Sequence, residues 1–455
     1  MSYGPRVPMC ASMMEPGEAL QALKPAAFVQ PVSEVSHTAE ERRGTLEGAR
    51  LAFGATLGTR LLVWAAAMAT IAIFGENTVA WHVLDPSGVT PAMHSGVLNA
   101  FLAPAARWDS VWYLLIAAHG YFNPASTNFF PLYPLLIGVG DRLFDNPILV
   151  GVAISLGCTV AALTLLYRLA LLDLDRPAAR MTVLLVSVFP ASLFLSAVYP
   201  TSLFLLLSIA AIYAARRDRW ALAGLCGGLA SATRSNGIVL IVPLALLYFY
   251  GPRGRAPHHQ PTGAWWRPRF SIHRDVAWLA LVPTGLAMYL GYLLFAHGAP
   301  LAPFHAAGVD WGHSFDPPFA AVFKALAEVP GDLRAILART GTPIGPGDPI
   351  SWQSRDLIDV VVAAVAVGAL ALAWHRVPRV YSIFAIAQLA QITSFPTKTE
   401  PMIGLPRYLL PIFPLFMGGG AYLAERRTAA RITLVASAGL LVLFSALWGY
   451  WALVP

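Results

Sequence analysis

Residues 51–74 read LAFGATLGTRLLVWAAAMATIAIF, a stretch long and apolar enough to cross a lipid bilayer as a single helix. A span needs about 20 mostly apolar residues, and its backbone must hydrogen-bond to itself within lipid. Arg42, Arg43 and Arg50 precede the stretch, and basic segments beside a span remain in the cytoplasm. The stretch therefore predicts an N-terminus inside the cell and a chain that emerges on the outer side near Gly75.

The composition extends this prediction to the whole chain. Of its 455 residues, 57% are hydrophobic and 12% are charged, whereas a soluble domain has about a quarter of its residues charged. The apolar runs are continuous rather than alternating, which favours helices over a membrane barrel. The net charge of +7 comes mainly from arginines in short clusters between these runs. That pattern is typical of cytoplasmic loops and argues against nucleic acid as a partner.

We expect an all-α polytopic membrane protein with about 11 transmembrane helices. The first 50 residues are polar and are predicted to form a disordered cytoplasmic tail, and residues 51–455 form the membrane domain. The segment 220–250 has both ends inside, so two short helices must meet within the membrane at Arg234-Ser235-Asn236-Gly237. The remaining expected spans are 51–74, 147–169, 181–198, 201–215, 276–296, 356–374, 380–395, 405–423 and 432–451.

Two long segments, 75–146 and 298–355, are expected to lie on the outer side as loops. The first is too long for a simple turn and contains amphipathic pieces at 108–118 and 129–139, which we interpret as helices lying at the outer interface. The alternative makes 129–140 a short span. It would place the later arginine clusters outside, so it is disfavoured.

Asp109 is the candidate catalytic residue, in the run Arg107-Trp108-Asp109-Ser110 beyond the first span. A carboxylate within hydrogen-bond reach of an acceptor hydroxyl can take its proton as the hydroxyl attacks. Arg107 and the neighbouring aromatic Trp108 would orient the carboxylate and tune its pKa. The alternative is an arginine–carboxylate pair that only holds an interfacial helix in place.

Candidate substrate contacts follow Asp109 in the same outer segment. His119 is suited to a phosphate or a hydroxyl and lies close to Tyr121, although a lone histidine is more often structural. Phe130 and Tyr133 belong to a cluster of aromatic residues and prolines that could form a wall for a sugar ring or a prenyl chain. An interfacial aromatic belt would have the same composition.

Two arginines are candidate ligands for a donor phosphate. Arg234 lies within an apolar stretch, where ionisable residues are functional suspects, and a guanidinium can give a phosphate two parallel hydrogen bonds. A pair with a carboxylate in the helix bundle is the alternative. Arg407 begins another apolar run, and Asn236 and Tyr408 are the polar neighbours of the two arginines.

The second long outer segment supplies weaker candidates, because loop carboxylates are common and this segment could simply cover the site. They are Asp310, His313 and Asp316.

Together these residues indicate chemistry on a lipid-linked sugar at the outer membrane face. A carboxylate base, two arginines for an anion and aromatic walls suit a lipid phosphate as leaving group, so no nucleotide-binding fold is needed. The sequence has no phosphate-binding glycine loop after a strand and no obvious metal-binding carboxylate pair. Its three cysteines lack metal-site spacing, so neither a metal nor a cofactor is expected.

The chain resembles the PIG-V family in four blocks that appear in family order. The first joins Arg107-Trp108-Asp109-Ser110, His119-Gly120-Tyr121 and Asn128-Phe129-Phe130-Pro131. The others are Phe189-Pro190-Ala191-Ser192 with Phe194-Leu195-Ser196-Ala197, then Ala232-Thr233-Arg234-Ser235-Asn236-Gly237, and finally Arg407-Tyr408.

The resemblance implies a GT-C glycosyltransferase fold and an inverting mannosyltransferase that needs no metal. Eukaryotic members of the family add the second mannose of the GPI anchor from dolichol-phosphate mannose at the luminal face, and Asp109 matches the acidic position of the first outer loop. The excess of arginine over lysine suggests a GC-rich bacterial genome. We therefore expect a plasma-membrane protein whose active site faces outward and whose donor is polyprenyl-phosphate mannose. The acceptor would be a glycolipid, a glycan or a protein.

Two other functions remain open from the sequence. A flippase or transporter of a lipid-linked sugar would share the arginines and the turned helices but would not need a base at Asp109. A non-catalytic subunit of an envelope-assembly complex would tolerate changes at Asp109, Arg234 and Arg407 alike. Membrane lipids and an accessory membrane subunit are further expected partners.

Overall fold

The computed structural model describes residues 32–91, 96–254, 268–341, 351–397 and 400–452. Two compact units are present, Met1–Gly44 and Thr45–Pro455. The prediction of a disordered tail over 1–50 is wrong from Val32 onward, because helix α1 (Val32–Phe74) begins there. This polar stretch contains four Glu and three Arg residues between Val32 and Arg50, and both residue types form helices readily, so the helix of the first span extends back into it. Residues 1–31 lie outside the described part of the chain.

The protein is an all-α integral membrane protein, as the sequence predicts. Among the described residues, four helices are long and apolar enough to cross a membrane, and a fifth results if one bent pair with a 46° angle forms a single span. The four are Arg42–Phe74 within α1, α6 (Pro147–Ala170), Gln353–Arg376 within α14 (Trp352–Arg376) and α18 (Arg427–Gly449), and the bent pair is η6 (Arg274–Leu281) with α11 (Thr284–His297).

Shorter apolar helices fill the rest of the bundle, and several expected spans are broken. The expected span 181–198 divides before Pro190 and the span 405–423 divides near Pro411, since proline cannot donate the backbone hydrogen bond that continues a helix. The pieces are α7 (Arg176–Val188), η4 (Pro190–Leu195), α8 (Thr201–Arg216), α9 (Trp220–Thr233), η5 (Ser235–Leu240), α10 (Ile241–Tyr250), α15 (Arg379–Thr393), α16 (Leu405–Leu409) and α17 (Phe413–Ala424). The number of about 11 spans remains a prediction.

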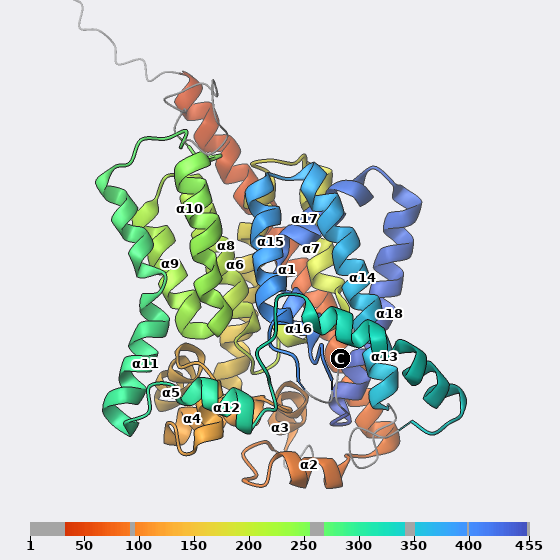
Figure 1. Ribbon diagram of the computed structural model, residues 1–455. Helices are drawn as coiled ribbons and strands as arrows, with labels where there is room; N and C mark the ends of the chain where they lie inside the picture. The colour runs from red at the N-terminus through yellow and green to blue at the C-terminus, as the bar shows by residue number, and fades with distance from the viewer. Residues whose placement is uncertain (1–31, 92–95, 255–267, 342–350, 398–399, 453–455) are drawn as a thin grey trace, which may run out of the picture. The chain divides into compact units, whose positions relative to one another are not determined.

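Both long segments that are expected on the outer side contain helices, which gather at one end of the bundle within Thr45–Pro455, the lower end in Figure 1. The two amphipathic pieces expected near Trp108 and Phe129 are helices α4 and α5, which confirms their helical structure. The helices at this end are α2 (Thr78–Leu84), α3 (Val97–Leu102), η2 (Ala103–Ala105), α4 (Ser110–His119), η3 (Pro124–Asn128), α5 (Leu132–Phe144), α12 (Ala302–Val309) and α13 (Ala320–Leu337).

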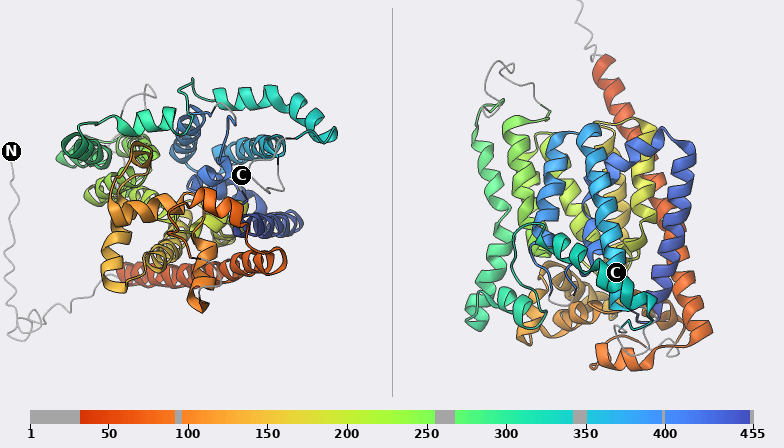
Figure 2. Two further views of the ribbon diagram at one scale, coloured as in Figure 1. Left: turned by 90° about the horizontal axis from the view of Figure 1, so that it is seen from below. Right: turned by 45° about the vertical axis from the view of Figure 1, so that its right-hand side comes forward.

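Small residues bring the bundle helices close together. A Cβ atom added to Gly285 of α11 would overlap the Gly228 carbonyl of α9, and one added to Gly418 of α17 would overlap the backbone of Ala373 in α14. Helices in lipid associate through such close backbone packing, because lipid tails are as apolar as the side chains. The bundle and the helices at its lower end, seen from two further directions in Figure 2, form the frame of the site.

Candidate active site

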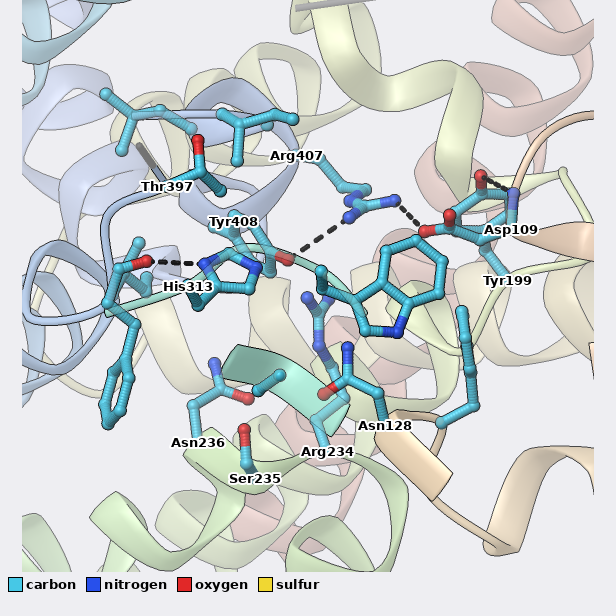
Figure 3. Close-up of a pocket in the computed structure, with 18 of the residues that line it drawn as sticks. Asp109, Asn128, Tyr199, Arg234, Ser235, Asn236, His313, Thr397, Arg407 and Tyr408 are labelled. Carbon is cyan, nitrogen blue, oxygen red and sulfur yellow. Dashed lines mark hydrogen bonds and ion pairs between the residues drawn. The ribbon is translucent and has the colours of Figure 1, made fainter. Parts of the chain in front are cut away.

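A cavity of about 760 Å³ lies within the unit Thr45–Pro455, and its walls come from segments far apart in the sequence. Most of its lining is apolar and aromatic. The acidic and basic side chains that line it are Asp109, Arg234, His313, Arg355 and Arg407. Figure 3 shows Asp109 on one side of this cavity, Arg407 and Tyr408 in the middle, and His313 on the opposite side.

The backbone of Asp109 is held where helix α4 begins. The residue is the N-cap of α4, and the preceding Trp108 has a positive φ of 55°, which directs the chain sharply into the helix. The Asp109 amide donates a hydrogen bond to the Tyr199 hydroxyl at 3.0 Å, and the Trp108 indole donates to the Ala452 carbonyl at 3.3 Å. These contacts fix the position of the carboxylate at the cavity wall.

The cation beside Asp109 is Arg407, not the adjacent Arg107. Arg407 Nη1 donates to Asp109 Oδ2 at 2.6 Å, and its Nη2 donates to the Tyr408 hydroxyl at 3.2 Å. The Phe194 and Tyr199 rings lie 5.5 and 5.4 Å from the guanidinium carbon. Both partners of the ion pair are about one-fifth to one-quarter exposed, at 19% and 24%, so the pair can be reached from the cavity.

Arg234 lies where α9 ends, as the sequence predicts for this turn. Its backbone is extended, with φ −155° and ψ 149°, which breaks α9 from η5. The guanidinium carbon lies 4.8 Å from the centre of the Tyr408 ring. Tyr408 is therefore in contact with both cavity arginines, because Arg407 lies 5.0 Å from the same ring. Within the described ranges, no carboxylate forms an ion pair with Arg234.

Asn236 lies two residues after Arg234 and forms two hydrogen bonds with Gln388 of α15. The Gln388 amide donates to the Asn236 backbone carbonyl at 3.1 Å, and the Asn236 amide donates to Gln388 Oε1 at 2.9 Å. Asn236 is 5% exposed, and its side-chain oxygen has no hydrogen-bond partner among the described residues. The side chain lines the cavity.

His313 comes from the outer segment between α12 and α13. The loop that carries it pairs with the segment before Arg407, with Ser314 donating to Pro396 and His313 bridged to Thr397. Nδ1 of His313 lies 2.7 Å from the Phe395 carbonyl oxygen. Burial, with a smaller effect of the nearby Arg407 charge, lowers the pKa of His313. The ring is therefore neutral at pH 7.

Arg355, the remaining arginine that lines the cavity, forms a buried ion pair with Glu400. Its Nε lies 2.6 Å from Glu400 Oε1, and the side chains are 1% and 0% exposed. The pair ties the start of α14 to the segment between Thr397 and Arg407. Within the described ranges, no group of three or more histidine, cysteine or acidic residues is arranged to hold a metal ion.

Comparison with known proteins finds a sequence family that matches part of the chain. Residues 57–248 match the family described as Mannosyltransferase (PIG-V). The resemblance noted in the sequence is thereby confirmed over this range.

Curated proteins are also similar to part of the chain. The mouse protein named GPI alpha-1,6-mannosyltransferase 2 is 31% identical over 236 residues, which are 48% of this chain and 46% of the mouse protein. The rat protein of that name is 35% identical over 170 residues, 35% of this chain and 34% of its own. The chain thus spans less than half the length of these curated relatives.

Among solved structures, the chain is similar to an oligosaccharyltransferase from Archaeoglobus fulgidus. The identity is 14% and the TM-score is 0.40, with 87% of this chain and 53% of that chain covered. At this level of similarity the GT-C fold remains an expectation from the sequence.

The matched range of the PIG-V family contains part of the cavity. Asp109, Arg234 and Asn236 lie within residues 57–248, whereas His313, Arg407 and Tyr408 lie beyond it. The cavity is therefore completed by side chains outside the matched range.

Some of the site residues predicted from the sequence line the cavity and others do not. Lining residues include Trp108 and Phe130 as well as Asp109, Arg234, Asn236, Arg407 and Tyr408. Tyr133 is fully buried and bonds Gly151 and Ser155, while His119 is exposed at the end of α4. Tyr121 bonds the Phe129 carbonyl at 2.7 Å and lines a separate cavity beside α11 and α12.

Arg107 points away from Asp109. It is 1% exposed, and its guanidinium carbon lies 4.6 Å from the Trp451 ring centre. Burial lowers the pKa of Arg107 to about 10. This contact holds Trp451 beside the start of α4. Arg107 therefore positions the segment that carries Asp109 without touching the carboxylate.

Sequence reasoning missed Tyr199 as a site residue. Tyr199 lies between the expected spans 181–198 and 201–215, shortly after the block that contains Phe194. Its hydroxyl bonds the Asp109 amide, and its ring contacts Arg407. A tyrosine next to a break between two apolar runs was the available signal, because such a polar group needs a partner when buried.

Proposed function

We propose that this chain is a membrane mannosyltransferase that moves mannose from polyprenyl-phosphate mannose to an acceptor hydroxyl. The acceptor would be a glycolipid, a glycan or a protein on the extracytoplasmic face, in the plasma membrane of a bacterium. The observation that carries the proposal is the meeting of Asp109, Arg407 and Arg234 in one mostly apolar cavity. The match to the PIG-V family over residues 57–248 supports mannose as the sugar.

The charges of the cavity favour an anionic ligand. Asp109 neutralises Arg407 and Glu400 neutralises Arg355, but Arg234 has no carboxylate partner among the described residues. An uncompensated guanidinium in apolar surroundings is costly unless a ligand pairs with it. A lipid phosphate provides the charge, and its prenyl chain provides apolar surface for the aromatic walls.

Asp109 is suited to act as the base in this reaction. Its Oδ2 accepts from Arg407, while Oδ1 has no hydrogen bond to any residue in the described ranges and remains available to an acceptor hydroxyl. The hydroxyl proton passes to the carboxylate as its oxygen attacks the anomeric carbon. Attack from the face opposite the phosphate inverts the configuration at that carbon.

The two arginines act on the leaving group. As the bond between the anomeric carbon and the phosphate oxygen breaks, its electron pair stays on the phosphate, where negative charge increases. Arg234, and the donors of Arg407 that Asp109 does not use, stabilise that charge. Preorganised donors of this kind commonly lower a barrier by several kcal/mol, roughly 3 to 4 kcal/mol for a single group.

The proposal is tested with purified protein in lipid nanodiscs and a crude envelope lipid extract. We expect radiolabel to move from polyprenyl-phosphate mannose to a new glycolipid or glycan, and no label to move from a nucleoside-diphosphate mannose. In sealed vesicles, movement of the labelled donor across the bilayer without any new product would instead identify a flippase. Transfer that requires a second membrane protein and tolerates changes at Asp109, Arg234 and Arg407 would instead identify this chain as the non-catalytic subunit of an envelope-assembly complex.

A further inference from the structure

Two side chains that line the cavity each have a hydrogen-bond acceptor that no donor among the described residues uses. One is Nε2 of His313 and the other is Oδ1 of Asn236. In Figure 3 both side chains lie on the side of the cavity opposite Asp109. The inference drawn from them rests on the proposed function and adds to it the recognition of the sugar.

The tautomer of His313 follows from its neighbour. A carbonyl oxygen can only accept, so Nδ1 must carry the proton that bridges the 2.7 Å to Phe395. In a neutral ring the other nitrogen, Nε2, then carries a lone pair. The two nitrogens are both bonded to Cε1, and their hydrogen-bonding directions diverge widely. Because Nδ1 is bound to the wall formed by the segment 394–397, Nε2 is directed away from that wall and toward the cavity.

The orientation of Asn236 follows from the same kind of reasoning. The backbone carbonyl of Asn236 requires a donor, so the Gln388 atom at 3.1 Å is its amide nitrogen. Gln388 Oε1 must then accept, and the atom 2.9 Å from it is the amide nitrogen of Asn236. That leaves Oδ1 of Asn236, which is buried and has no partner among the described residues. A buried acceptor without a donor is unfavourable, because it has lost its hydrogen bonds to water and gained none in return.

These acceptors cannot serve the phosphate. Phosphate oxygens accept hydrogen bonds, as do Nε2 and Oδ1, so contact between them would bring lone pairs together. Hydroxyl groups donate, and a hexose carries several of them close to its anomeric carbon. Donors for the phosphate and acceptors for hydroxyls are thus supplied by different residues of one cavity.

We infer that His313 Nε2 and Asn236 Oδ1 accept hydrogen bonds from hydroxyls of the transferred sugar and so determine which hexose the site takes. A site built to accept a hydroxyl proton discriminates strongly against a sugar that lacks that hydroxyl, because the buried acceptor is then left unpaired.

The test compares a short-chain polyprenyl-phosphate mannose with its 2-, 3-, 4- and 6-deoxy forms as donors. For wild type we expect kcat/KM to fall roughly 10- to 100-fold with at least one deoxy donor. His313→Phe should lower kcat/KM for the parent donor by a similar factor and show little further loss with that deoxy donor. His313→Gln retains an acceptor oxygen and should recover part of the discrimination.

Controls separate this inference from the proposed function. His375→Ala changes an exposed histidine at the end of α14 and should leave both transfer and discrimination unchanged. Undiminished discrimination in His313→Phe and His313→Gln, with wild type active, would overturn this inference alone. Absence of mannose transfer by wild type would refute the proposed function, and the inference with it.

Discussion

At Asp109, a single ion pair fixes the carboxylate and leaves one of its oxygens available. Arg407 comes from 298 positions later in the chain, and its guanidinium is held by the aromatic rings of Phe194, Tyr199 and Tyr408. Arg234 contacts the same Tyr408 ring. Two arginines around one tyrosine provide several N–H donors for an anion, and they differ in that only Arg407 has a carboxylate partner among the described residues.

Arg234→Gln is expected to weaken the use of the donor. Arg234 is the cavity arginine that has no carboxylate partner among the described residues. Removal of its guanidinium should raise the KM for polyprenyl-phosphate mannose about tenfold or more, because a charge-assisted hydrogen bond contributes roughly 1.5–3 kcal/mol. Arg234→Lys should be intermediate, since an ammonium cannot form two parallel bonds. Arg431→Gln, at an exposed site in α18, is the control. A KM in Arg234→Gln equal to that of the control would exclude a phosphate role for Arg234.

The donor kinetics should depend on pH through His313. Burial and the facing Arg407 lower its pKa below the usual 6.5, so Nε2 can accept at neutral pH and loses this ability as pH falls through that lowered pKa. We expect kcat/KM for the donor to decline in acid in wild type and to decline less in His313→Gln, measured over pH 4.5–8. Identical profiles for the two proteins would show that another group titrates.

At the scale of elements, the break between α9 and η5 brings Arg234 and Asn236 to the cavity. Gly237 makes the break possible by close approach: a Cβ atom there would overlap the Ala230 carbonyl and lie 2.5 Å from the Ser231 nitrogen. The turn therefore depends on a glycine three residues after the arginine it presents.

Gly237→Ala should disrupt this turn. We expect lower thermal stability in detergent and a loss of transfer larger than the loss of folded protein, because the displaced turn carries Arg234. The matched control is Gly157→Ala in α6, where an added Cβ meets nothing within 4 Å. That change should be neutral or stabilising by up to about 1 kcal/mol, since alanine favours helices. Equal melting temperatures for the two variants would contradict this account of the turn.

Helices and turns were predicted correctly from the sequence where a short range of residues determines the local structure. The turn at Arg234, helix α4 and helix α5 were all visible as polar breaks or amphipathic runs. The divisions before Pro190 and near Pro411 were not predicted, because hydropathy averages over a window and does not register a missing backbone donor.

Partners distant in the sequence could not be predicted from one chain. Proximity in sequence favoured Arg107 as the cation for Asp109, yet the fold brings in Arg407 and buries Arg107 beside Trp451. Likewise, nothing local distinguished His313 from the loop residues Asp310 and Asp316. Its place in the cavity comes from pairing of its loop with the segment 394–397.

At the scale of the whole molecule, the distribution of arginines predicts which end of the bundle faces the cytoplasm. The cavity is lined by residues of α2 and α12, and both helices lie at the lower end of the bundle in Figure 1. The arginines before α18 and those before α9 are expected at the cytoplasmic face. The cavity must therefore open on the outer side for the proposed reaction to take place there.

Single cysteines introduced into a cysteine-free background test this orientation. Cysteine at His119, exposed at the end of α4, should react with a membrane-impermeant maleimide added to intact cells or right-side-out vesicles. Cysteine at Thr428, exposed at the start of α18, should react only after the membrane is permeabilised. The reverse labelling pattern would show that the cavity opens toward the cytoplasm and would exclude an extracytoplasmic acceptor.

The most direct test of the central claim is mannose transfer by wild type beside Asp109→Asn, at matched amounts of folded protein. Asparagine keeps the size of the side chain but cannot take a proton, so we predict a fall in transfer rate of about 100-fold or more, with binding of the donor retained. Transfer by Asp109→Asn at the wild-type rate would contradict the account, because the cavity would then work without the carboxylate at its centre.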